Sequence, residues 1–273
     1  MRNELVYEKN QDFNFINRYL HSFRFRWISS IIESLKKNNK DEKITIVDIG
    51  CGTCKLFGIL QKQNLNFNYV GVEPLDEFVE VAKKRYGNFK NFSIIHSFIE
   101  NSMNLLPEKI DLFTAMESFE HIPEYLVPSI LKSISEKKPK LLAISVPVEI
   151  GPSILIKNLG SKLMGYCRHK EYTWKETFLA SIYLLEKIPA HTTGHKGFDW
   201  RWLKHNIRQY FYIKKINKSP YNFIPSALAP SICFTGIPKE EIKVLDDNQI
   251  KFKLDFEQQA RSDRKTIKQS KKI

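Results

Sequence analysis

Short apolar runs rich in Val and Ile recur along residues 43–236, and segments with apolar residues at helical spacing separate most of them. Such strands alternating with amphipathic helices are typical of βαβ units, in which helices cover a parallel sheet on both faces. We expect strands at residues 43–48, 69–73, 92–96, 110–115, 141–146, 211–216 and 231–236. The pattern therefore predicts an α/β fold on a mostly parallel, seven-stranded sheet.

The region before the first strand predicts one or two helices that lead into the core. Its apolar residues near helical spacing are Phe15, Leu20, Phe23, Trp27, Ile31 and Leu35. Within the alternation, further helices are expected from about Thr53, over 75–86, around 125–135 and from Asp199.

Residues 147–198 interrupt the alternation, because no strand is evident between the fifth and sixth expected strands. They are interpreted as helices over 153–164 and 174–187, followed by a polar loop. Such an insertion would lie over the carboxyl ends of the parallel strands, where ligands bind in open α/β sheets. We therefore expect it to cover the substrate.

No internal repeat and no Gly/Ser-rich or Pro-rich linker marks a domain boundary, so one elaborated domain is expected. The expected segments are an N-terminal helical region (1–42), a ligand-binding core (43–146), the helical insertion (147–198), the end of the core sheet (199–237) and a basic tail (238–273).

The net charge is +13, and residues 261–273 carry six Lys or Arg and one Asp. A basic excess favours anionic partners such as nucleic acid, phosphorylated metabolites or an acidic membrane surface. A general bias towards Lys, Asn and Ile along the chain is the alternative explanation. Charge alone does not decide between the two.

Four cysteines are too few for a disulfide scaffold, and the N-terminus lacks the apolar run of a signal peptide. The most apolar window, residues 141–165, is interrupted by proline, glutamate and lysine, whereas a spanning helix needs about 20 mostly apolar residues in a row. The sequence thus predicts a cytoplasmic protein with reduced thiols and no transmembrane segment.

The stretch "VDIGCGTC" contains two overlapping motifs. Cys51 and Cys54 form a C-x-x-C, which is the spacing of a redox pair or of half a zinc site. Gly50 and Gly52 form a G-x-G between a strand and a helix, which is the start of a nucleotide-binding turn. No second C-x-x-C accompanies the cysteines, so no metal site is expected and the glycines are taken as the functional pair.

An acidic residue supports the nucleotide interpretation. Glu73 ends the second expected strand, 21 residues after Gly52, where a carboxylate can bind the two hydroxyls of a ribose. The turn has neither a third glycine nor a G-K-[ST] to hold a pyrophosphate. The expected ligand is therefore a nucleoside without a pyrophosphate.

The motifs "VDIGCGT", "VGVEP" and "IDLFTAMESFEHIP" resemble those of the class I S-adenosylmethionine-dependent methyltransferases, in particular the small-molecule branch that includes ubiquinone-biosynthesis O-methyltransferases. "FSIIHSFIENS" is similar to the third-strand segment of that family. The resemblance covers residues 44–146 well and 199–236 more loosely. It implies a Rossmann-like methyltransferase fold with S-adenosyl-L-methionine as the cofactor.

The resemblance also implies roles for individual residues. The methionine end of the cofactor would lie against Asp48, Gly50, Gly52 and Glu117, the ribose on Glu73, and the adenine beside Ser97, Phe98 and Ile99. Two positions depart from the family pattern, which usually has glycine at Cys54 and often an acid at Ser97. A helical φ is expected at Cys54, so this small residue should be tolerated there.

Methyl transfer from a sulfonium is an in-line displacement, so the enzyme has mainly to position the reactants and exclude water. If the acceptor is a hydroxyl, a base must take its proton, and histidine has a suitable pKa. The candidates are His121, which follows the fourth strand, and His191 and His195 in the loop that closes the insertion.

The sequence does not name the methyl acceptor. A small-molecule, sugar or lipid-linked acceptor, methylated at oxygen, is the main hypothesis. Lys157 and Lys162 interrupt the apolar segment 153–165 at spacings that could give a helix one apolar and one cationic face, as in helices that contact an acidic membrane peripherally. An ordinary core helix of the insertion is the alternative explanation.

Two other functions stay open. An RNA-binding methyltransferase would explain "RHKEYTWK" and "RQYFYIKK", although no RNA-binding module is recognisable, so nucleic acid is not the expected partner. A catalytically silent partner protein with a cofactor-binding fold would explain the altered Cys54.

Overall fold

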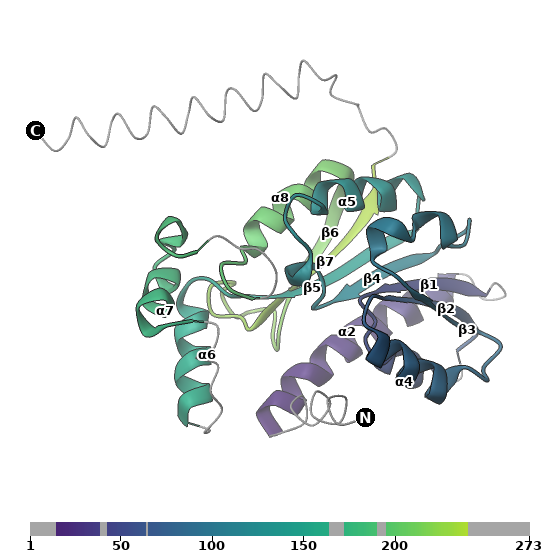
Figure 1. Cartoon of the computed structure of the whole chain (residues 1–273), viewed down its shortest axis with the longest axis horizontal. Coiled ribbons are helices and arrows are strands. Elements are labelled where there is room, and N and C mark those ends of the chain that lie inside the picture. The colour runs from purple at the N-terminus through teal and green to yellow at the C-terminus, as the bar shows by residue number, and fades with distance from the viewer. Residues whose placement is uncertain (1–14, 39–42, 64, 164–171, 190–194, 240–273) are drawn as a thin grey trace, which may run out of the picture. The chain divides into compact units, whose positions relative to one another are not determined.

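The computed structural model describes residues 15–38, 43–63, 65–163, 172–189 and 195–239. At its centre is a seven-stranded sheet in the order β3-β2-β1-β4-β5-β7-β6 (Figure 1). The strands are β1 (Ile44–Ile49), β2 (Phe67–Glu73), β3 (Phe92–His96), β4 (Leu112–Met116), β5 (Leu141–Pro147), β6 (Phe211–Lys218) and β7 (Ser231–Pro238). The expected α/β fold and its seven strands are confirmed.

Pairing in the sheet is parallel from β3 through β2, β1 and β4 to β5, whereas β7 pairs antiparallel with both β5 and β6. The strand order runs outward from β1 in both directions, so the direction of winding reverses between β1 and β4. Ligands bind at such a switch point, outside the carboxyl ends of the strands.

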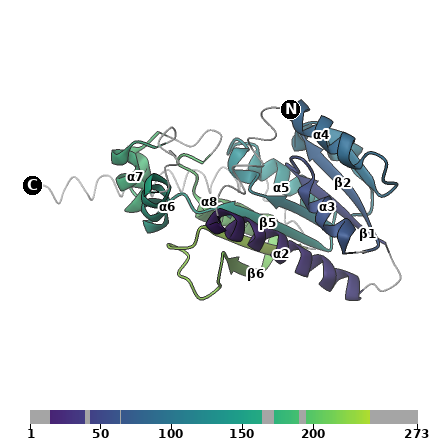
Figure 2. The ribbon, with the colours of Figure 1, turned by 90° about the horizontal axis from the view of Figure 1, so that it is seen from below.

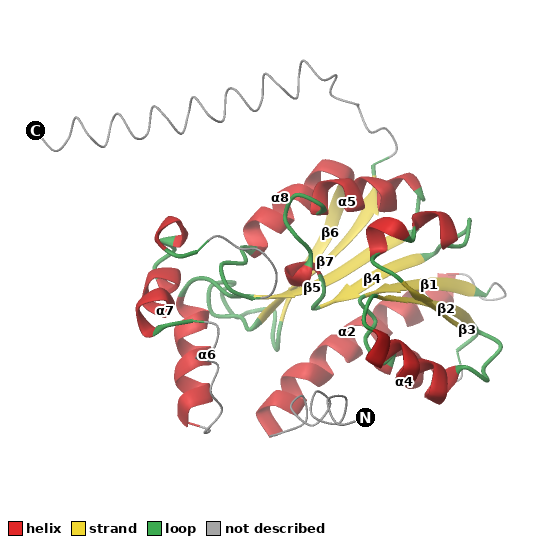
Figure 3. Cartoon of the chain, viewed as in Figure 1, coloured by secondary structure: helices red, strands yellow, loops and turns green. Residues whose placement is uncertain are grey.

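Helices cover both faces of the sheet (Figures 1 and 3). One hydrophobic core lies under α5 (Val127–Glu136) and α8 (Trp200–Tyr210), and the other under α2 (Phe15–Asn38), α3 (Lys55–Lys62) and α4 (Asp76–Tyr86). Because side chains alternate along a strand, Ile44 and Ile46 of β1 enter the second core, whereas Val47 and Ile49 enter the first.

The N-terminal segment forms one helix in the described residues, α2, rather than two. Its buried face is centred on Ile28 and Ile32, which are fully buried, while Ile31 and Leu35 pack at the edge of the core. The face predicted from spacing was therefore rotated by about one residue. Trp27 is common to the predicted and the observed face.

The insertion contains α6 (Pro152–Leu163) and α7 (Trp174–Ser181), which follow the carboxyl end of β5. Figures 1 and 2 both place α6 and α7 side by side, at a distance from β1–β3. Asn158 Nδ2 donates to Thr177 Oγ1 at 2.7 Å in the interface between the two helices. A small separate cluster of buried residues completes this unit, consisting of Ile154, Tyr172, Ala180 and Ile188.

The second helix of the insertion is shorter than the sequence predicts. A capping box between Thr173 and Glu176 starts α7, but the helix ends at Ser181 instead of residue 187. Tyr183 has a φ of +63°, which an α-helix cannot accommodate, and a separate 3-10 turn follows at Leu185–Lys187. Helical spacing of apolar residues does not reveal such a backbone reversal.

Residues 1–239 form one compact unit, and residues 240–273 form a second unit that lies outside the described residues. The expected basic tail therefore has no structural description here. Among the described helices, none combines the length and the apolar character needed to cross a membrane.

Candidate active site

Two glycines with positive φ form the turn after β1, Gly50 at +63° and Gly52 at +53°. A Cβ atom on Gly50 would lie 2.5 Å from Ser118 Oγ, so this turn packs directly against the loop after β4. A Cβ atom on Gly52 would meet no heavy atom within 4 Å. Open space thus borders Gly52 at the switch point, where a ligand can approach the backbone closely.

Glu73 at the end of β2 closes the same turn. Its Oε2 accepts from the Gly52 amide at 2.8 Å and its Oε1 accepts from the Leu75 amide at 3.1 Å. Burial raises the pKa of Glu73, and the two amide donors oppose that shift. Each carboxylate oxygen has a second lone pair, so Glu73 can hold the turn and still accept hydrogen bonds from ribose hydroxyls.

Asp48 lies beneath the turn at the end of β1 and is almost completely buried. Tyr69 Oη donates to its Oδ2 at 2.6 Å. Burial raises the pKa of Asp48 to about 7, with a further increase from the charge of Glu73 and a partial decrease from the Tyr69 hydroxyl. A cationic group next to Asp48 would therefore favour its ionised form.

The C-x-x-C motif packs against the sheet. A Cβ atom on Gly71 of β2 would lie 2.6 Å from Cys51 Sγ and 3.2 Å from Cys54 Sγ. Burial, and secondarily the neighbouring Cys54, raise the pKa of the Cys51 thiol well above its usual value, so Cys51 is not a thiolate nucleophile at neutral pH. The arrangement is that of two small side chains over a glycine, of which Cys51 is half-buried and Cys54 is buried.

The expectation of a helical φ at Cys54 is wrong. Cys54 is the N-cap of α3 with a φ of +56°, in the left-handed region that favours glycine. Its sulfur is fully buried and lies 3.4 Å from Cys51 Sγ. Cysteine is thus accommodated by packing at a position where glycine would avoid the backbone strain.

The three residues assigned to the adenine by resemblance differ in their surroundings. Phe98 is 59% exposed beyond the end of β3, so its ring is available to a ligand. Ser97 Oγ donates to the Phe98 carbonyl at 3.1 Å. The Ile99 side chain is buried in the core, so a contact of Ile99 with the adenine would have to come from its backbone.

Glu117, the first residue after β4, adopts a φ of +55°. Its Oε2 lies 3.1 Å from Nη1 of Arg24 on α2, and Ser145 Oγ donates to its Oε1 at 3.4 Å. Non-glycine residues with positive φ are concentrated at functional sites, where the surroundings hold them in place. The N-terminal helix thus reaches the site through Arg24.

The carboxyl group of Glu120 is not satisfied by hydrogen bonds from the described residues. The side chain is fully buried in the turn Phe119–His121, and neither carboxylate oxygen has a hydrogen-bond partner in the part of the chain that the structure describes. Burial raises its pKa to about 8, although its own backbone amide and then the positive charge of Arg24 act in the opposite direction. A carboxyl group in this state is uncommon and needs an explanation.

His121 and His195 meet although 73 residues separate them in the sequence. Their ring centroids are 5.2 Å apart and their planes are inclined by 75°. His121 is exposed, whereas His195 is half-buried. The third histidine candidate, His191, lies outside the described residues.

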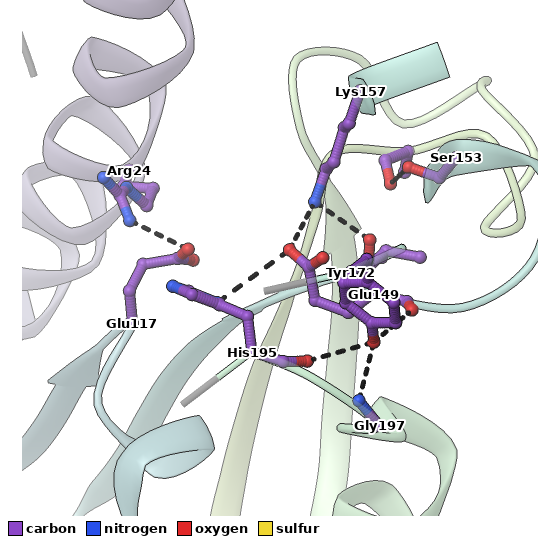
Figure 4. A network of polar contacts seen from close by, with 10 residues as sticks. Arg24, Glu117, Glu149, Ser153, Lys157, Tyr172, His195 and Gly197 are labelled. Carbon is purple, nitrogen blue, oxygen red and sulfur yellow. Dashed lines mark hydrogen bonds and ion pairs between the residues drawn. The ribbon is translucent and has the colours of Figure 1, made fainter. Parts of the chain in front are cut away.

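A network of polar contacts holds His195 in place (Figure 4). Glu149, which follows β5, is 1% exposed, and its Oε1 lies 3.9 Å from His195 Nδ1 and 3.1 Å from Lys157 Nζ. The Tyr172 hydroxyl donates to the His195 carbonyl at 3.4 Å and accepts from the Gly197 amide at 2.6 Å. The loop that carries His195 is therefore anchored on the first residues of the insertion.

Lys157 does not lie on an exposed cationic face, as the amphipathic pattern suggested. Its ammonium group donates to the Val148 carbonyl at 2.9 Å and to Glu149, and only 16% of its side chain is exposed. The exposed face of α6 instead carries Ile156 and Leu159. The structure does not describe the side chain of Lys162.

Reasoning from the sequence missed Arg24, Glu120 and Glu149, and it considered Lys157 only for an exposed cationic face. For Glu120 a signal existed, because it directly precedes His121 in the turn after the fourth strand. For the others no local pattern was available, since they come from α2, the end of β5 and α6. Asp199, from which a helix was expected to start, caps α8 and pairs with Arg201 at 2.7 Å.

Comparison with known proteins relates this architecture to one family. Residues 46–137 match the family model described as "Methyltransferase domain". A solved S-adenosylmethionine-dependent methyltransferase from Clostridium acetobutylicum ATCC 824 is 12% identical, with a TM-score of 0.54, over 87% of this chain and 98% of that chain. The methyltransferase domain of bacterial CtHen1-C is 16% identical, with a TM-score of 0.50, over 80% and 98% of the two chains.

No curated protein matches the chain. At these identities the solved structures establish the fold alone. The matched segment, residues 46–137, contains the glycine turn, Glu73 and the Glu120–His121 turn, whereas His195 lies beyond it.

Proposed function

Through residues 46–137 the chain belongs to the S-adenosylmethionine-dependent methyltransferases of class I, and from this premise we propose that it methylates a hydroxyl group on a small-molecule, sugar or lipid-linked acceptor. The observation that carries the proposal is the group of polar side chains at the carboxyl ends of β4 and β5, of which all but the exposed His121 are buried or half-buried: Glu117, Glu120, His121, Glu149 and His195.

The residues of the first half of the sheet fit the cofactor. Open space beside Gly52 admits a ligand against the backbone, and Glu73 faces this turn with lone pairs still available. Phe98 offers an exposed ring on the neighbouring strand end. These residues would hold the nucleoside, and the buried carboxyl of Asp48 would favour the positively charged methionine end.

S-adenosylmethionine supplies an electrophilic methyl group on a sulfonium. The acceptor oxygen forms the new C–O bond while the C–S bond breaks and its electron pair returns to sulfur, and a base takes the hydroxyl proton. His195 and His121 are the candidates for that base, because both rings lie at the carboxyl end of β4. Glu149 beside His195 would stabilise the ring after it has taken the proton.

Exposed apolar side chains on the insertion favour an acceptor with an apolar part. Ile156 and Leu159 on α6 are 59% and 54% exposed. Trp174, Phe178 and Ile182 lie four residues apart along and just after α7, and between 45% and 57% of each is exposed. Residues 147–198 would in this way form the substrate cover, and the apolar stripes would receive a lipid chain.

A peripheral contact with an acidic membrane is part of the same proposal. The net charge of +13 supplies the attraction, and exposed Trp and Phe side chains are the kind that insert at the interface. The protein would act in the cytoplasm and bind the membrane reversibly. Lys157 has no part in this attraction, since it is paired with Glu149.

The proposal is tested by methyl transfer from S-adenosylmethionine labelled in its methyl group to a cell extract separated into lipid, small-molecule, RNA and protein fractions. Label in the lipid or small-molecule fraction, stable to mild alkali as expected for a methyl ether, supports the proposal. Label that appears only in RNA would support the RNA-methyltransferase alternative and contradict the acceptor class proposed here.

A calorimetric titration with S-adenosylmethionine separates these outcomes from the third alternative. Heat of binding together with transfer of label is expected. Binding without transfer to any fraction would indicate a catalytically silent partner protein.

A further inference from the structure

Three side chains that can bind a metal ion converge at the carboxyl end of β4. Glu120, His121 and His195 each place one ligand atom, a carboxylate oxygen or a ring nitrogen, within 4.8 Å of those of the other two. Two of the residues are adjacent in the turn after β4, and the third comes from the end of the insertion. The fold, and not a local motif, brings them together.

The state of Glu120 is an independent observation that points to a cation. Its side chain has an exposure of 0%, and in the described part of the chain neither oxygen has a hydrogen-bond partner. A buried carboxylate is normally paired, hydrogen-bonded or bound to a metal, because leaving its charge unsatisfied costs several kcal/mol. A cation bound to Glu120 would also be within reach of the two histidine rings, whose ligand atoms lie within 4.8 Å of a Glu120 oxygen.

His195 has the surroundings of a metal-binding histidine. Ligand histidines commonly direct their second ring nitrogen to a carboxylate that fixes the ring, and Glu149 Oε1 lies 3.9 Å from His195 Nδ1. Lys157 holds the same carboxylate oxygen at 3.1 Å. Glu149 would therefore act as a positioning residue.

We propose that Glu120, His121 and His195 form a binding site for one divalent transition-metal ion. Two imidazoles and one carboxylate suit Mn²⁺, Fe²⁺, Co²⁺ or Zn²⁺, whereas Mg²⁺ and Ca²⁺ prefer sites made only of oxygen ligands. Three protein ligands leave coordination positions open, as in catalytic rather than structural metal sites.

The observed geometry needs only a small adjustment. Two atoms bound to one ion lie at most about 4.2 Å apart, because each metal–ligand distance is about 2.1 Å. The ligand atoms of the three residues lie up to 4.8 Å apart, and small rotations of the side chains bring them within bonding distance of one ion. His121 is exposed, so an ion can enter from solvent on its side.

With the ion bound, His121 and His195 would be its ligands instead of the base, and the open positions of the ion would take an oxygen of the methyl acceptor, lower the pKa of its hydroxyl group and let the proton leave to solvent. This use of the ion depends on the proposed function, whereas the binding of the ion does not. The test therefore measures binding without cofactor and without acceptor.

The experiment is calorimetric titration of the chelator-treated protein with Mn²⁺ and, separately, with Co²⁺. One ion per chain is expected. Glu120→Gln, His121→Ala and His195→Ala should each weaken the affinity at least tenfold, whereas Glu136→Gln and His205→Ala, which alter exposed residues outside the site, should leave it unchanged. Because His121 is exposed, its replacement leaves the core intact and separates loss of a ligand from misfolding.

Cobalt also distinguishes this site from the cysteine pair. With Glu120, His121 and His195 as ligands, the Co²⁺ spectrum should lack the near-ultraviolet thiolate band and should be the same in the double variant Cys51→Ala and Cys54→Ala. Absence of binding by the wild-type protein, or affinities unchanged in the Glu120→Gln, His121→Ala and His195→Ala variants, would overturn the proposal. Glu120 would then be a neutral buried carboxyl group.

Discussion

Glu73→Gln tests the cofactor site most directly, because it replaces the carboxylate by a group of nearly the same shape. Glu73 uses one oxygen for the Gly52 amide at 2.8 Å and the other for the Leu75 amide at 3.1 Å. In glutamine one of these oxygens becomes an NH2 group, which cannot accept a hydrogen bond. The turn therefore loses one acceptor, and the ribose loses a charged partner.

The expected loss can be estimated from the bonds involved. A hydrogen bond to a charged group contributes about 1.5 to 3 kcal/mol, so the loss of one such bond to the ribose should weaken S-adenosylmethionine binding by about 10- to 150-fold. The stability of the free protein should change less, because glutamine also removes the cost of burying a charge at Glu73, whose pKa burial raises.

Isothermal titration with S-adenosylmethionine measures the difference in affinity between the wild type and Glu73→Gln. The control is Glu80→Gln, which alters an exposed residue on α4. Circular dichroism confirms that each variant is folded. A folded Glu73→Gln protein with an affinity within twofold of wild type would refute the placement of the ribose on Glu73.

Three further predictions concern the residues around the glycine turn. Gly50→Ala should unfold at a lower urea concentration than Gly52→Ala. In both variants alanine at a positive φ costs about 1 to 2 kcal/mol, but only the Cβ at position 50 also meets Ser118 Oγ, at 2.5 Å. Gly52→Ala should instead lose more cofactor affinity than stability, since its Cβ enters the open space, and equal affinity in calorimetry would contradict this. The pKa of Asp48 is about 7 in the folded protein, so between pH about 4 and 7 the folded protein keeps a proton that the unfolded chain has released. The free energy of unfolding should therefore fall as the pH rises across this window. Asp48→Asn should make this dependence on pH weaker, as measured by urea titrations without cofactor.

The sequence predicted the elements that repeat a local pattern. Alternating apolar residues placed all seven strands, and the edges of β2 and β4 differ by only two residues from those expected. The order strand, glycine turn, helix and acid also placed Glu73 beside Gly52 correctly, because both lie at the carboxyl ends of adjacent parallel strands. Local spacing is sufficient for such features.

Features that depend on contacts between distant segments were not predictable in this way. The contact between His121 and His195 depends on the path that the whole insertion follows through space. The inward direction of Lys157 depends on its ion pair with Glu149. The positive φ values of Cys54 and Tyr183 were missed because neither is glycine, so composition gave no sign of a backbone reversal. Strain at such residues is held by the surrounding packing.

The C-x-x-C motif gives a last prediction, since packing alone should explain it. Gly71→Ala places a Cβ 2.6 Å from Cys51 Sγ and 3.2 Å from Cys54 Sγ, and overpacking of this kind costs about 1 to 3 kcal/mol. Removal of the Cys51 sulfur opens that space. In a Cys51→Ala background, Gly71→Ala should therefore cost less by about 1 kcal/mol or more, a coupling expected of residues in contact.

Urea unfolding of the two single variants and the double variant measures this coupling. Gly160→Ala on α6 is the matched control, because its Cβ would meet no heavy atom within 4 Å, and its effect should add to that of Cys51→Ala. If the effects of Gly71→Ala and Cys51→Ala were also additive, the cysteine would not fill the space above Gly71. A role in redox or metal chemistry would then again have to explain why two cysteines stand beside the cofactor turn.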